Sequence, residues 1–169
     1  MKPSIKLNAL TLISVIAMVF GVAAPVRAAT PVVALSPSAS TVAVGATTVV
    51  SITVASVENL YGIEVHLTFD PAVLEVVDAN AGTDGIQIAN GTFLSPDFVA
   101  QNVADNAAGK IDYAISQMHP QVGKTGSGTI ATITFKGKAS GSAAVNFTSV
   151  LLSDPVGAAI AGSSSNGTV

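Results

Sequence analysis

The sequence predicts an all-β fold in which short strands pack as a sandwich. Ala, Val, Thr, Ser and Gly dominate the chain, and β-branched residues recur in short runs that turn residues separate. No segment carries the apolar period of a helix of useful length. Residues 29–169 are one domain's worth, long enough to bury roughly two thirds of the surface that the unfolded chain exposes.

Nine or ten strands follow one another along the chain, because the first two runs form either one bent strand or two separate ones. Each run is rich in Val, Ile, Thr, Leu or Phe and is bounded by turn residues. The predicted strands are residues 32–36, 40–44, 47–54, 60–69, 74–80, 98–103, 110–117, 128–137, 142–153 and 158–161.

Turn chemistry accounts for the breaks between these runs. Gly45, Gly109 and Gly141 lie in such breaks and can take positive φ. The longest irregular stretch, residues 78–97, contains three glycines and a proline and is expected to cross between two sheets rather than close a hairpin. The polar tail, residues 162–169, is expected to fray unless its last two residues extend a strand.

The first 28 residues have the pattern of a signal peptide. Lys2 and Lys6 precede an almost uncharged apolar run, and the small residues Val26 and Ala28 of "VRA" fit a cleavage site after Ala28. We therefore expect a secreted, extracellular protein whose folded domain is residues 29–169. The membrane becomes a partner only if this segment stays uncleaved as an anchor.

Charge argues against nucleic acid as a partner. Three of the seven basic residues lie in residues 1–28, so residues 29–169 carry four scattered lysines against all ten acidic residues. A phosphate-binding surface needs clustered Lys or Arg. The chain has no cysteine, so its core must hold the fold without disulfides.

The sequence offers no set of residues for catalysis. Only two histidines, His66 and His119, and no cysteine are present, and no G-x-S-x-G, H-E-x-x-H or P-loop motif occurs. Nothing in the spacing brings two of the acidic residues together across a cleft, as glycoside hydrolysis requires. We assign no catalytic residue and expect no enzymatic activity.

Metal and carbohydrate sites are weakly indicated. Asp78, Asn80, Asp84 and Asn90 crowd one connection, but their spacing matches no EF-hand loop and these residue types are ordinary in turns. The sequence has no Trp and two tyrosines, too few for a flat aromatic platform. We assign no metal ligand and no cofactor, whereas binding of a single sugar chain through hydrogen bonds stays open.

The run "YGIEVHLTFDP", residues 61–71, alternates in the period of a half-buried strand. Ile63, Val65 and Leu67 fall on one face, and Glu64 and His66 fall on the other. The first face is core. The second is either solvated, as is usual for an antiparallel sheet, or a binding surface.

The chain resembles the cohesin domain, the module of cellulosome scaffoldins that binds dockerin domains. The likeness covers residues 32–161 and rests on "VSITVASVENLYGIEVHLTFDPAVLEVVDA", "GKIDYAISQ" and "GTIATITFKGKASGSAAVNFTSVLLSDPVGAAI". It implies a nine-stranded β-sandwich of jelly-roll topology, related in fold to some carbohydrate-binding modules. The residues 60–69, 98–103, 110–117 and 142–153 would then form the sheet face that receives the dockerin.

The phase of each strand names the outward residues of that face. The resemblance implies that the partner-binding residues are Gly62, Glu64, His66, Thr68, Gln101, Val103, Asp112, Ala114, Ser116, Asn146 and Thr148. Many members of the family carry Asn and Asp where this chain has Gly62 and Glu64, which affects the choice of dockerin.

The expected partners are dockerin-containing proteins, with the calcium carried by the dockerin, in complexes that degrade polysaccharides. Two alternatives stay open at this point. The domain is a carbohydrate-binding module with polysaccharide as its partner, or it is a surface structural sandwich without a dockerin partner.

Overall fold

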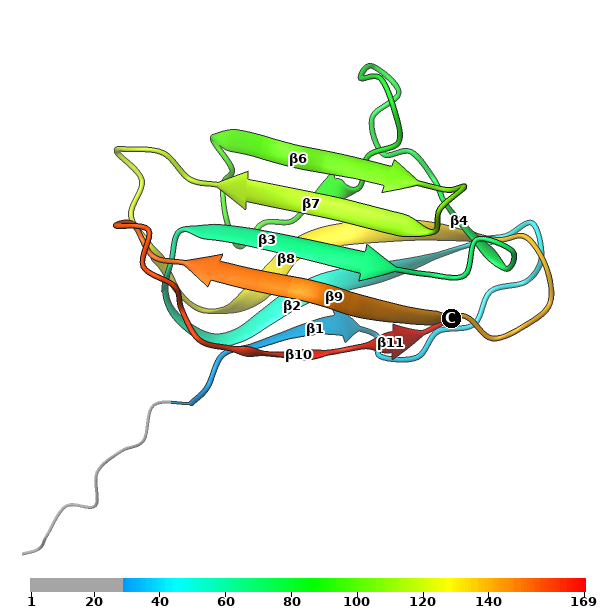
Figure 1. Ribbon diagram of the computed structural model, residues 1–169, viewed down its shortest axis with the longest axis horizontal. Helices are drawn as coiled ribbons and strands as arrows, with labels where there is room; N and C mark the ends of the chain where they lie inside the picture. The colour runs from blue at the N-terminus through cyan, green and yellow to red at the C-terminus, as the bar shows by residue number, and fades with distance from the viewer. Residues whose placement is uncertain (1–28) are drawn as a thin grey trace, which may run out of the picture.

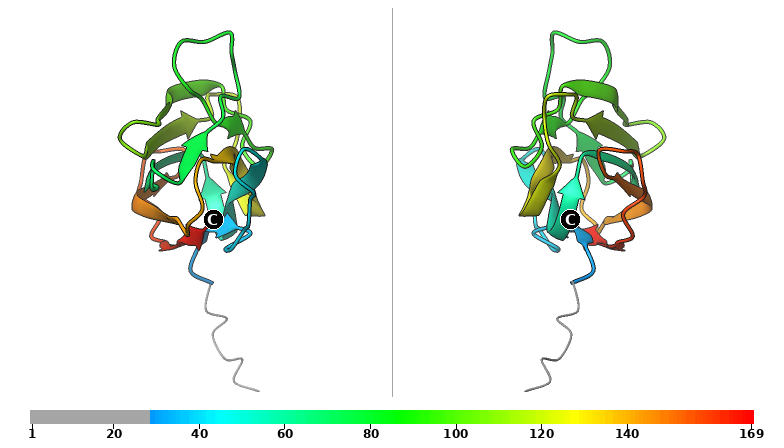
Figure 2. Two further views of the ribbon diagram at one scale, coloured as in Figure 1. Left: turned by 90° about the vertical axis from the view of Figure 1, so that its right-hand side faces the viewer. Right: turned by 90° about the vertical axis from the view of Figure 1, so that its left-hand side faces the viewer.

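The computed structural model describes residues 29–169, which form two β-sheets packed face to face (Figures 1 and 2). The predicted all-β sandwich is confirmed. Among residues 29–169, no helix is long and apolar enough to cross a membrane. The expected signal segment, residues 1–28, lies outside the described residues.

The back sheet, the layer farther from the viewer in Figure 1, has the strand order β10-β1-β2-β8-β4, and β5 also pairs with β8. Its long strands β2 and β8 pair antiparallel along their length. Its members are β1 (Val32–Ser36), β2 (Thr47–Leu60), β4 (Leu74–Val76), β5 (Ala89–Asn90), β8 (Lys124–Gly137) and β10 (Ser163–Ser165).

The front sheet has the strand order β11-β9-β3-β7-β6. Its members are β3 (Gly62–Thr68), β6 (Phe98–Asp105), β7 (Lys110–Ser116), β9 (Ala144–Ser153) and β11 (Gly167–Thr168). The chain passes repeatedly from one sheet to the other, which is the interleaved connection of a jelly roll. Residues 78–97 make one of these crossings, as predicted, because they lead from β4 in the back sheet, by way of β5 in the same sheet, to β6 in the front sheet.

The described residues form eleven strands, whereas the sequence predicts nine or ten, and the differences lie in short segments. Residues 40–44 make no strand, because Gly45 has a φ of 83° and the amide of Ala46 bonds the carbonyl of Ala43 in a tight turn. Residues 158–161 also make none, because the Asp154 carboxylate accepts bonds from the amides of Val156 and Ala158. The tail does not fray: Thr168 pairs with β9.

Two strands run farther than the sequence predicts, because bulges let them continue past turn-like residues. Ser56 and Asn59 in β2 have φ values of 55° and 57°, and the register with β8 shifts on either side of Val57. The hydroxyls of Ser127 and Thr125 accept the amide hydrogens of these two residues at 3.0 Å each. The bulges therefore leave no donor unsatisfied at these points.

The core lies between the sheets and is built from the inward faces of the long strands. Tyr113 and Phe135 are fully buried, and Phe69 packs edge-to-face on Phe135 with ring centroids 5.5 Å apart. The Tyr113 hydroxyl crosses the layer to donate to Oδ1 of Asn90, 2.7 Å away. Burial raises the pKa of Tyr113 above its usual range, so this phenol stays a donor at any ordinary pH.

Replacing Phe135 by Ala is expected to lower the free energy of unfolding by about 3–5 kcal/mol, because it removes a fully buried ring and leaves a cavity between the sheets. Urea unfolding followed by circular dichroism measures the change. The matched control is Val44→Ala, whose side chain is exposed and whose loss should change stability by less than about 0.5 kcal/mol. Equal effects of the two substitutions would contradict the packing described here.

Candidate functional site

The outward face of the front sheet brings the predicted binding residues of β3 and β7 side by side. Antiparallel register places Gly62 opposite Ser116, Glu64 opposite Ala114 and His66 opposite Asp112. All six lie on the side away from the core, since their neighbours along each strand are buried. Thr68 completes the β3 row and lies opposite Lys110.

Strand β6 adds Gln101 and Val103 to the same face. Gln101 lies opposite Ala114, and Val103 lies opposite Asp112. The register shifts at Ala100, where a bulge adds one residue. Because of this bulge Phe98 also faces outward, opposite Ser116, with 53% of its surface exposed; it is absent from the predicted residues, which take only positions 101 and 103 from this strand.

Strand β9 completes the face on the other side of β3. Asn146 lies opposite Thr68, as the phase predicts, and Thr148 lies in a bulge where it donates to the carbonyl of His66 at 3.2 Å. After the bulge the outward residues are Ser149, opposite His66, and Leu151, opposite Glu64. Strict alternation from the inward Val145 predicts that Ser149 and Leu151 point into the core. The sequence analysis therefore did not name them as outward residues.

His66 lies between two carboxylates at the centre of the face. Its Nδ1 is 2.5 Å from Oδ1 of Asp112 on the neighbouring strand, and its Nε2 is 2.8 Å from Oε1 of Glu64 on its own strand. Carboxylates only accept hydrogen bonds, so both ring nitrogens donate only when the imidazole carries two protons. In this charged cluster, Glu64, His66 and Asp112, both hydrogen bonds therefore form only when the histidine is protonated. The cluster then has a net charge of −1.

The cluster shifts the titration of its histidine. The hydrogen bond to Asp112, and then that to Glu64, hold the pKa of His66 above its usual value of 6.5, against the opposing effect of burial. The three side chains are each between 31% and 43% exposed. They are thus open to solvent and within reach of a partner.

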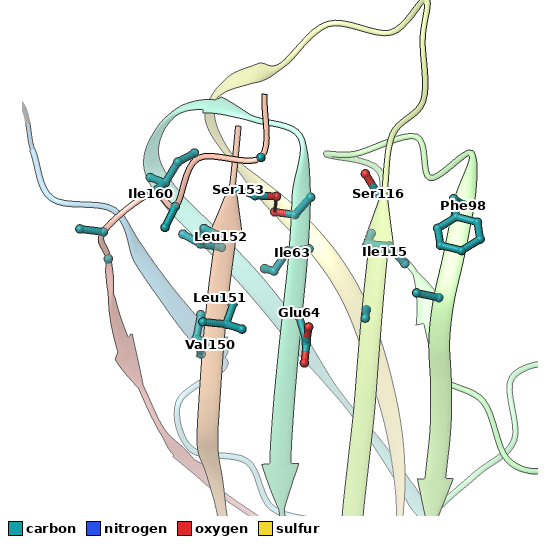
Figure 3. A pocket seen from close by; sticks show the side chains of 17 residues that line it. Ile63, Glu64, Phe98, Ile115, Ser116, Val150, Leu151, Leu152, Ser153 and Ile160 are labelled. Atoms are coloured by element: carbon teal, nitrogen blue, oxygen red, sulfur yellow. Dashed lines mark hydrogen bonds between the residues drawn. The ribbon is translucent and has the colours of Figure 1, made fainter. Parts of the chain in front are cut away.

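A groove lies at one end of the same face (Figure 3). Gly62, Ser116 and Ser153 form its floor, while Leu151 and Phe98 stand at its two sides. Its volume is about 600 Å³, and Glu64 lies at its border with the charged cluster. The face therefore joins an apolar depression to a negatively charged centre.

Other residues that the sequence analysis weighed have local roles. Asp78 accepts hydrogen bonds from the amides of Asn80 and Gln87, which lower its pKa and fix the turn. Among residues 29–169, no group of three or more His, Cys, Asp or Glu residues is placed to hold a metal ion. His119 lies exposed in the loop after β7, far along the chain from the cluster.

Replacing Asp112 by Asn is expected to lower the pKa of His66 toward its usual value, because the largest cause of the upward shift is the bond to that carboxylate. Nuclear magnetic resonance titration of the imidazole signals measures it, with His66→Gln to assign the resonance. The matched control is Asp105→Asn, which removes a carboxylate from the same face without a contact to His66. An unchanged pKa in the Asp112 variant would contradict the cluster geometry.

Stability should also depend on pH through His66. Its pKa is raised in the folded state, so its stabilising contribution is fully present below the unfolded value of about 6.5 and is lost as pH rises through the folded value. Between about pH 6 and about pH 9, wild type should therefore lose more unfolding free energy than His66→Gln. Urea unfolding at both pH values tests this, since the other histidine is present in both proteins and its effect cancels.

A family model and solved structures point to the same family. The family model described as Cohesin domain matches residues 33–169. Comparison with curated protein sequences finds no match.

Solved cohesin structures share the fold at low sequence identity. The non-cellulosomal cohesin from the archaeon Archaeoglobus fulgidus is 18% identical, with a TM-score of 0.64 over 83% of this chain and 89% of that chain. A type II cohesin domain from the cellulosome of Acetivibrio cellulolyticus is 22% identical, with a TM-score of 0.66 over 83% and 94%. A cohesin chain from a type II Cohesin-X-Dockerin complex of Acetivibrio cellulolyticus is 20% identical, with a TM-score of 0.66 over 83% and 97%.

The match to the family model spans almost all of the described residues, and the two-sheet sandwich is the fold of these solved cohesins. The chain therefore belongs to the cohesin domain family.

Proposed function

We propose that this protein is an exported binding module that docks dockerin-bearing proteins through the outward face of its front sheet. The observation that carries the proposal is the composition of that face, where a charged cluster and an apolar groove adjoin across β9, β3, β7 and β6. The cohesin family is one of non-catalytic protein-binding modules, and a related cohesin occurs in a Cohesin-X-Dockerin complex. Both support binding rather than catalysis.

The contrast between the two sheets supports the choice of face. Hydroxyl-bearing residues, among them Ser51, Thr53, Thr132 and Thr134, dominate the outward positions of β2 and β8. The ion pair there, Glu75 with Lys136 at 2.9 Å, is neutral overall. The front face instead carries three carboxylates, on Glu64, Asp105 and Asp112, against two cations, Lys110 and the protonated His66, and is negative overall.

In this proposal residues 1–28 direct export, and the complexes that form degrade polysaccharides outside the cell. Calcium is carried by the dockerin, whose loops need the ion to fold. Small residues such as Ala114 and Ser116 let a helix of the partner approach the sheet closely. Glu64 and Asp112 receive Lys, Arg or hydroxyl groups from that helix.

Replacing Ala114 by Arg should abolish docking while leaving the fold intact, because an outward side chain in the middle of the face blocks a closely packed helix and changes stability little. Titration calorimetry against a panel of dockerin domains, with and without a calcium chelator, measures the affinity. The matched control is Ala55→Arg, an exposed position on the back sheet, which should bind like wild type.

Equal affinity of the Ala114 and Ala55 variants would place the interface elsewhere, and calcium-independent binding would rule out the dockerin mechanism. Binding to insoluble polysaccharides, with no dockerin bound in the panel, would support the carbohydrate-binding alternative in its place.

A further inference from the structure

The groove on the front sheet is open because its floor is made of small residues. Gly62 is buried between Ser116 on β7 and Ser153 on β9, and a Cβ at Gly62 would come within 2.8 Å of Oγ of Ser153. The hydroxyls and the missing side chain leave a depression across the strands (Figure 3). Nothing from residues 29–169 fills it.

Large apolar side chains stand exposed at the sides of this groove. Leu151 is 57% exposed and Phe98 is 53% exposed, and Ile160 from the connection after β9 closes the same side as Leu151. Exposed Leu and Phe that line one depression gain free energy when an apolar group covers them. The side walls therefore favour an apolar occupant over a sugar ring, for which the groove offers a single aromatic side chain.

Backbone pairing decides which kind of segment can lie on the groove. At the groove, β3 and β7 are hydrogen-bonded to a strand on each side, and Leu152 of β9 accepts the amide of Ile160 on the side away from β3. An added strand could therefore pair only with the outer edge of β6, which lies beside the floor and not over it. A helix, whose own backbone bonds are internal, can cover the floor without pairing with the sheet.

The charged cluster supplies the second contact. Oδ1 of Asp112 and Oε1 of Glu64 face His66, whereas the second oxygen of each carboxylate makes no hydrogen bond to the described residues. Along β3, Glu64 lies two residues from Gly62, which is about 7 Å at a rise of about 3.3 Å per residue. His66, which lies opposite Asp112, is four residues from Gly62, or about 13 Å. The same distances are about one to two turns of a helix.

We propose that the groove receives one large aliphatic or aromatic side chain from a helix of the partner, and that a Lys or Arg one to two turns away on that helix binds the free oxygens of Glu64 and Asp112. The inference rests on the proposed docking function and names the chemistry that selects the partner. The net negative charge of the cluster favours the cation, and the exposed walls favour the apolar anchor.

A displayed library of a dockerin domain, randomised at the exposed positions of its helices, tests the pairing. Selection against the full-length protein should enrich a large apolar residue at one position and Lys or Arg about four to nine positions away. Leu151→Ser should weaken the selected clones at least about tenfold, because it removes a wall of the groove. Its matched control, Val156→Ser, changes an exposed residue outside the groove lining and should leave their affinity unchanged.

Two further variants separate the apolar from the charged contact. Gly62→Leu fills the floor of the groove and should also abolish binding, with thermal denaturation to show that the sandwich persists. Glu64→Gln combined with Asp112→Asn should weaken binding about tenfold and flatten its dependence on salt.

The outcomes distinguish this inference from the proposed function. Clones that bind wild type but show no enriched apolar position, or that tolerate both Leu151→Ser and Gly62→Leu, would overturn the groove inference and leave docking intact. A library that yields binders to a type II cohesin in parallel but none to this protein would overturn both.

Discussion

The antiparallel register of β3 with both of its neighbours is the constraint on which the candidate site depends. β3 pairs with β7 on one side and β9 on the other, and its inward residues Ile63, Val65 and Leu67 are buried in the core. Because side chains alternate with a period of two, a slip of one residue would bury Glu64 and His66. Burying these charges is costly, so the core and the outward face fix each other.

Alternation explains how much of the site the sequence could predict. In β3 and β7 the apolar period is unbroken, and all the outward residues named from it lie on the outward face. In β6 and β9 a bulge inserts one residue and reverses the phase beyond it. Phe98, Ser149 and Leu151 were missed for this reason, because the pairing of two strands and not the local sequence determines where an extra residue sits.

The short back-sheet segments escaped prediction for a related cause. β5 has two residues and β10 three, which is too short for a hydrophobic period to be read. β5 nevertheless matters, since Asn90 accepts the hydroxyl of the buried Tyr113. A buried phenol needs a partner, and that requirement holds part of the 78–97 connection against the core where the sequence shows turn residues alone.

Glu64 belongs to both the charged cluster and the lining of the groove. Binding in the groove and protonation of His66 are therefore coupled through this side chain. One oxygen of Glu64 faces His66 and the carboxylate borders the groove. A cation bound at Glu64 adds positive charge beside the imidazolium and therefore disfavours its second proton, so binding and deprotonation of His66 assist each other. A side chain at position 62 would close the floor, since even a Cβ there comes within 2.8 Å of Oγ of Ser153, and Asp at position 64 would shorten the reach of the carboxylate. Gly62 and Glu64 thus act together: the glycine opens the depression, and the longer Glu64 reaches between it and the histidine.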